Sequence, residues 1–120
     1  MSNDKPKAPA FVLGAALPQF TWTVRVPVPG NDDYAHAELP LTFQAVDQPE
    51  LDELQNGGKL QADIVRRVVV GWPGLKDAHG SDVPFSPEAL EKLMAAPMVR
   101  VAIVATYFAA MTGTAARKNA

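Results

Sequence analysis

Residues 20–45, FTWTVRVPVPGNDDYAHAELPLTFQA, contain two runs of alternating apolar and polar residues with a turn between them. Apolar residues occupy the even positions of residues 20–28 and the odd positions of residues 37–45. A period of two is typical of strands that bury one face, and residues 29–33 (PGNDD) favour a turn. The stretch therefore predicts an antiparallel β-hairpin with a long loop. Pro27 indicates that the first strand is an edge strand or ends there.

On the N-terminal side of the hairpin, residues 1–18 are rich in proline and in small or polar residues. We expect them to form a disordered or loosely attached arm. Their apolar run, residues 11–17, is too short for a signal peptide and is bracketed by prolines. The predicted organisation is an arm at 1–18, a single α+β domain at 19–113 and a polar tail at 114–120.

After the hairpin the pattern changes to one that favours helices. Asp47 followed by Glu50 resembles a capping box, and a short helix is expected at residues 50–55 before two glycines. A second helix is expected from about Lys59. It should give way to extended chain at the three valines of residues 68–70, because β-branched side chains favour strands.

The chain then passes through a predicted structural corner, formed by Gly71, Trp72, Pro73 and Gly74. Proline disfavours a helical conformation in the residue before it, so Trp72 either anchors a bend in the core or is an exposed binding aromatic. Residues 74–85 predict a small hairpin or a compact loop. Ser86 is a predicted N-cap, because a Pro-Glu pair follows it at the start of a helix.

Pro97 interrupts this helix, and a last helix is predicted at residues 98–111. Twelve of its fourteen residues are apolar or aromatic. Such a helix is either buried on every side or partly covered by a partner, and both interpretations stay open. As a hypothesis, the protein-binding residues are Val101, Val104, Tyr107, Phe108 and Met111. The predicted fold class is α+β, with an N-terminal antiparallel β-hairpin packed against a C-terminal set of about four short helices.

The composition excludes several classes of function. The 120 residues carry 11 basic and 13 acidic side chains, so the formal net charge of −2 leaves no surplus of cations for nucleic acid. The sequence has no cysteine, which removes thiolate metal sites, disulfides and cysteine nucleophiles. A membrane span needs about 20 apolar residues, more than the last helix contains.

The sequence also lacks a recognisable catalytic pattern. His36 and His79 are expected in loops and do not have the spacing of metal-binding motifs. Ser86 is explained by its capping role and is not part of a nucleophile elbow. We therefore expect a protein that is not an enzyme and that needs no cofactor and no metal. The alternative from another class is a small enzyme or metal-binding protein that uses the two histidines.

Four segments carry a resemblance that covers about residues 20–119: FTWTVRVPVPG, LPLTFQAVDQPELDEL, VVVGWPGLKDAHGSDVPFSPEALEKLMAAPMVRVAIVATY and ARKNA. The most specific part is GWPGL followed by a DxxG turn, VPFS and a helix broken at AAPMV. In this order the segments resemble the tail assembly chaperones of long-tailed bacteriophages and prophages.

The resemblance implies a non-catalytic assembly factor in the cytoplasm of the bacterial host. Chaperones of this family cover the tape-measure protein until tail-tube subunits polymerise around it. The implied partners are thus the tape-measure protein and the tail-tube protein, and self-association into a homo-oligomer is a further expectation. Neither nucleic acid nor a membrane is an expected partner. The alternative role is that of a structural minor tail or tail-completion protein of the phage particle.

Overall fold

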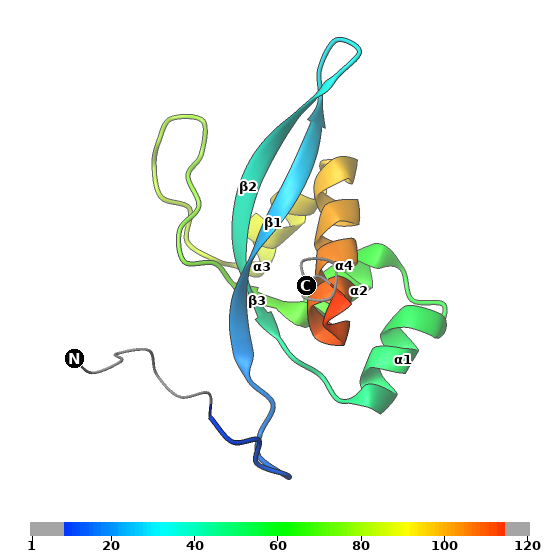
Figure 1. Cartoon of the computed structure of the whole chain (residues 1–120). Coiled ribbons are helices and arrows are strands. Elements are labelled where there is room, and N and C mark those ends of the chain that lie inside the picture. Colours follow the sequence, from blue (N-terminus) through cyan, green and yellow to red (C-terminus); the bar gives the residue numbers. More distant parts are fainter. Residues whose placement is uncertain (1–8, 115–120) are drawn as a thin grey trace, which may run out of the picture.

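The computed structural model describes residues 9–114, which form a three-stranded antiparallel sheet with four helices packed beside it (Figure 1). In chain order the elements are β1 (Gln19–Pro29), β2 (Tyr34–Gln44), α1 (Gln48–Asn56), α2 (Gln61–Val68), β3 (Val69–Gly71), α3 (Pro87–Met94) and α4 (Pro97–Thr112). This architecture confirms the predicted α+β class. The outer parts of the predicted arm and tail, residues 1–8 and 115–120, lie outside the described residues.

The β1–β2 hairpin has a tighter turn than the sequence suggested. Its strands pair along their full length, and the Gly30 N–H donates a hydrogen bond to the Asp33 carbonyl at 2.8 Å. Asp32 adopts a left-handed φ of 62°, a conformation that aspartate tolerates better than most residues. Because this residue closes the turn within residues 30–33, the prediction of a long loop was wrong.

The hairpin register determines which backbone groups of β1 face away from β2. The Ala45 N–H donates to the Pro18 carbonyl at 3.0 Å, in the same register as the turn hydrogen bond. Even-numbered β1 residues therefore bond to β2, and odd-numbered residues direct their backbone groups to the other edge. Pro27 and Pro29 are both odd-numbered, so this edge lacks two N–H donors. Among residues 9–114, β1 pairs with β2 alone.

The third strand arises where the valine run follows α2. β3 pairs with β2 in antiparallel fashion, with Gly71 opposite Thr42 and Val69 opposite Phe43. The sequence predicted extended chain here but not the strand with which it would pair. Val68 still belongs to α2, and the Val69 N–H donates to the Val65 carbonyl, so helix and strand follow each other directly.

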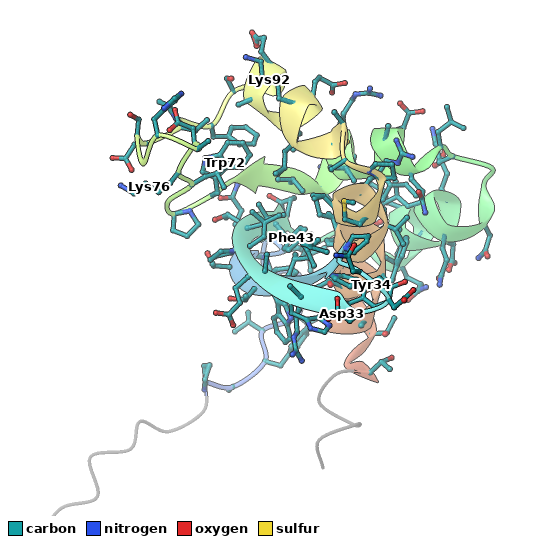
Figure 2. The ribbon with its side chains drawn as sticks, turned by 90° about the horizontal axis from the view of Figure 1, so that it is seen from above. Asp33, Tyr34, Phe43, Trp72, Lys76 and Lys92 are labelled. Carbon is teal, nitrogen blue, oxygen red and sulfur yellow. The ribbon has the colours of Figure 1, made fainter. Side chains whose placement is uncertain are left out.

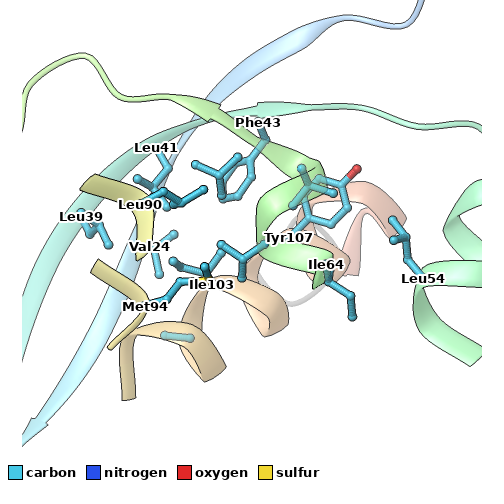
Figure 3. Packing of buried hydrophobic residues seen from close by; sticks show 14 of the residues in the cluster. Val24, Leu39, Leu41, Phe43, Leu54, Ile64, Leu90, Met94, Ile103 and Tyr107 are labelled. Carbon is cyan, nitrogen blue, oxygen red and sulfur yellow. The ribbon is translucent and has the colours of Figure 1, made fainter. Parts of the chain in front are cut away.

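A single hydrophobic core joins the sheet to the helices, and it includes the aromatic rings of Phe43 and Tyr107 (Figure 3). The ring centroid of Phe43 lies 5.4 Å from that of Tyr107 and 5.6 Å from that of Phe20. The Tyr107 hydroxyl donates to the Gln44 carbonyl at 2.7 Å. Burial raises the pKa of Tyr107 to about 12. The last helix is thus fixed to the end of the hairpin strand by packing and by one hydrogen bond.

Two adjacent arginines of α2 form ion pairs with the neighbouring helices. The Arg66 guanidinium binds both carboxylate oxygens of Glu91 in α3, at 2.7 and 2.8 Å. This pairing lowers the pKa of Glu91 below its usual value and raises that of Arg66. Arg67 binds both carboxylate oxygens of Glu50 in α1. The two-point geometry fixes helix orientation more than it adds stability, since all these groups are at least partly exposed.

The loop between β3 and α3 is organised by Trp72, which Figure 2 shows at the base of the segment that carries Lys76. Its indole N–H donates to the Val83 carbonyl at 2.7 Å, and its ring meets the edge of Phe85 with centroids 4.8 Å apart. Lys76 and Asp82 form an antiparallel bridge within the loop. The small hairpin expected at residues 74–85 is therefore present, and the half-buried Trp72 holds it against the sheet.

Replacing Ser86 with alanine should lower the free energy of unfolding by about 1 kcal/mol. The Ser86 hydroxyl accepts a hydrogen bond from the Ala89 N–H at 3.0 Å and so satisfies an otherwise unpaired donor at the start of α3. Urea unfolding followed by circular dichroism would measure the loss. The matched control is Ser81→Ala in the exposed loop, which should change stability by less than about 0.5 kcal/mol. Equal losses for the two variants would show that the cap contributes nothing.

Candidate functional site

An open hollow of about 500 Å³ lies between the turn end of the hairpin and the first half of α4. We call it the hairpin–α4 groove. In Figure 1 the turn end of the hairpin projects beyond the helices, with α4 beside β1. The hairpin side of the groove is formed by Arg25, Pro27, Pro29 and Tyr34. The volume is within the range of about 300–1,000 Å³ that natural ligand pockets occupy.

The helical wall of the groove exists because α4 is apolar nearly all round. Its inner face, with Ala102, Ile103 and Tyr107, is buried in the core. Successive turns of its other face place Met98, Val101 and Ala105 in the groove. The Val101 side chain remains 51% exposed. The helix is therefore only partly covered by its own domain, and the uncovered part borders a hollow.

A basic residue lies on the wall of the groove, and two acidic residues lie in the adjoining turn. Arg25 lies on the hairpin wall, opposite Glu38 in the β1–β2 register. It takes part in none of the ion pairs found within residues 9–114. Asp32 and Asp33 lie at the turn next to Tyr34. A mostly apolar hollow with one cation on its wall, and with two carboxylates in the adjoining turn, fits an amphipathic protein segment.

The five predicted binding residues are distributed around α4. Val101 lies in the groove. Val104, Phe108 and Met111 are half-buried and pack against the core. Tyr107 is fully enclosed, so its ring supports the fold and is out of reach of a partner in this conformation.

The hairpin wall of the groove was missed in the sequence because its residues belong to the face of β1 that alternates with buried valines. Arg25, Pro27 and Pro29 occupy the positions assigned to solvent by the period of two. The sequence contains one indication that this face is unusual, because two prolines and a single arginine share it. Only the tertiary position of α4 turns these residues into a wall.

The residues considered for catalysis or metal binding do not form a site. His36 was expected in a loop but lies in β2 opposite Pro27, because the turn ends at residue 33. His79 lies in the exposed loop before α3. Within residues 9–114 no group of three or more histidine and carboxylate side chains could hold a metal ion.

No single helix in this part of the chain is long and apolar enough to cross a membrane. The pair α3 and α4 passes on length and composition, but the two helices are bent by 106° at their junction.

Comparison with known proteins identifies the family to which the chain belongs. A family model described as phage tail assembly chaperone matches residues 8–119. The chain belongs to the phage tail assembly chaperone family. No curated protein and no solved structure matches the chaperone. The match confirms the resemblance seen in the sequence, and it includes both walls of the hairpin–α4 groove.

Membership in the family makes the groove relevant to protein binding. A tail assembly chaperone binds tail proteins before or during assembly, and binding of a protein requires an accessible complementary surface. In this chaperone, Val101 and the hairpin–α4 groove supply apolar surface that its own domain leaves open.

Proposed function

We propose that this chaperone shields the tape-measure protein by holding one of its amphipathic helices in the hairpin–α4 groove, in the cytoplasm of the bacterial host. The observation that carries the proposal is that Val101 is half exposed in a mostly apolar helical wall. The activity consists of binding and release without catalysis. The tail-tube protein is the proposed second partner, which replaces the chaperone when the tube forms.

Helix-in-groove recognition suits both molecules. An amphipathic helix presents apolar residues at spacings of three and four, and an apolar groove accepts them as anchors. In the chaperone, Met98, Val101 and Ala105 provide one wall and Pro27 the other. A carboxylate of the client beside its apolar stripe would pair with Arg25. The proposed ligand is therefore an apolar helix face flanked by an acidic residue.

The flank of α4 provides a second proposed contact area. Val104, Phe108 and Met111 keep part of their surface accessible. Together with Val101 they follow α4 at intervals of three and four residues, so they lie along one side of the helix. A long client helix that leaves the groove could continue along this side.

Val101→Asp should weaken capture of the tape-measure protein about tenfold or more while leaving the chaperone folded. A carboxylate placed against an apolar partner costs desolvation energy, and about 1.4 kcal/mol corresponds to a tenfold change in affinity. The measurement is co-purification of coexpressed tape-measure protein, with affinity then determined by titration of the purified pair. The matched control is Leu60→Asp, which changes an exposed leucine outside the groove.

Capture by the Val101→Asp protein at wild-type affinity would refute the groove as the binding site. Loss of capture by both aspartate variants would indicate that any added charge disturbs the complex, which also contradicts a local site. Circular dichroism of both variants establishes that they are folded.

A further inference from the structure

The chain carries an exposed apolar segment before β1, at residues 11–17 (FVLGAAL), which we call the apolar arm. Phe11 is 90% exposed, Leu13 is 93% exposed and Val12 is 65% exposed. Such large side chains left in water are unusual on a monomer unless a partner covers them. The arm thus has the chemistry that the hairpin–α4 groove would accept.

The apolar arm leaves the sheet at the end opposite to the groove (Figure 1). The side-chain amide of Gln44 donates to the Leu17 carbonyl at 3.3 Å and holds the root of the arm there. From the start of β1 to Arg25 the strand covers about 20 Å, and to Pro29 about 33 Å. The eight residues from Phe11 to the start of β1 span at most about 28 Å when fully extended.

The arm is not fully extended, because a turn at Gly14 shortens it. Gly14 has a φ of 83°, and the Ala15 N–H donates to the Val12 carbonyl at 3.4 Å. An arm doubled back along its own strand would therefore reach at most the near end of its groove. The groove of another molecule is free of this restriction.

We propose that the apolar arm of one chaperone molecule occupies the hairpin–α4 groove of a second copy. Each copy has one arm and one groove, so in an assembly each arm can be paired with the groove of another copy. The charges are also opposite in sign, since the sequence places Lys5 and Lys7 shortly before the arm, and Asp32 and Asp33 lie in the turn next to Tyr34 of the groove. The contact covers both surfaces until a client takes the groove. That displacement rests on the proposed function, but the self-association does not.

A complementation experiment tests the exchange. One variant, Phe11→Ser with Leu13→Ser, loses the arm anchors but keeps the groove. Its fold is not at risk, because both side chains are almost fully exposed. The other variant, Val101→Asp, loses the groove but keeps the arm. Sedimentation velocity of the full chain, without tape-measure protein, measures association over a range of concentrations.

The expected results are specific. The wild-type protein associates, and each variant alone associates about tenfold more weakly or stays monomeric. An equimolar mixture of the two variants forms a one-to-one dimer, because the intact arm of one fits the intact groove of the other. Leu60→Ser, a matched change of an exposed leucine outside both the arm and the groove, associates like the wild type.

A wild-type protein that is monomeric at every concentration overturns the proposal. So does an arm variant that associates like the wild type, or a mixture that stays monomeric. These outcomes are separate from a failure of the proposed function, which is measured by capture of the tape-measure protein. A monomeric chaperone whose Val101→Asp variant loses its client would refute only the arm exchange.

Discussion

Replacing Tyr107 with alanine is expected to lower the free energy of unfolding by about 3–5 kcal/mol, the usual range for removal of a buried large aromatic ring. The Tyr107 side chain is fully buried, and its ring lies beside those of Phe20, Phe43 and Phe108. The cavity left behind would separate α4 from the hairpin. Urea unfolding followed by circular dichroism measures the change, and a loss below about 1 kcal/mol would show that the ring is not central to the core.

The control for this variant is Tyr107→Phe, which keeps the ring and removes only the hydrogen bond to the Gln44 carbonyl. It should lose about 1 kcal/mol. It should also change the alkaline pH dependence. Burial raises the pKa of folded Tyr107 to about 12, whereas an unfolded tyrosine has a pKa of about 10. The contribution of this group to stability is complete below pH 10 and falls as the pH rises toward 12. That part of the decline should be absent in Tyr107→Phe.

Ile103→Asp is expected to unfold the domain or to cost several kcal/mol, whereas Val101→Asp two positions earlier should cost less than about 0.5 kcal/mol. The Ile103 side chain has no exposed surface, and the Val101 side chain is half exposed. The loss of stability caused by the same substitution thus distinguishes the inner face of α4 from its groove face. Thermal and urea unfolding of the two purified variants provide the comparison.

Ile103→Val serves as the control for position 103, with an expected loss of about 0.5–1.5 kcal/mol. Equal destabilisation by aspartate at positions 101 and 103 would place Val101 in the core. It would also remove the basis for the hairpin–α4 groove as a binding site.

The local elements could be predicted from the sequence because their signals are local. Alternation marked the hairpin strands, Asp47 and Ser86 marked two helix starts, and Pro97 marked the break before α4. The structure places the Asp47 side chain within 3.1 Å of the Glu50 N–H as a cap. By contrast, the tight turn depends on one left-handed residue, Asp32, which a run of turn-forming residues does not single out.

Of the candidate site, the sequence pointed to α4 but not to the hairpin wall of the groove. The abundance of apolar residues in α4 left open whether its own domain covers all of it, and the half-exposed Val101 shows that it does not. The partner strand of β3 and the hairpin wall of the groove depend on contacts between distant parts of the chain. A periodicity assigns a residue such as Arg25 to one face of a strand, but not to the element that will lie beside that face.

The two prolines on the open edge of β1 have a consequence for the way copies of this chaperone can meet. An unpaired strand edge can form backbone hydrogen bonds with strands of other molecules, and repeated pairing of this kind leads to fibrils. Pro27 and Pro29 remove two of the N–H donors that such pairing would use. The two prolines thereby protect this border of the chaperone, which leaves Val101 and the hairpin–α4 groove exposed, from amyloid-like growth.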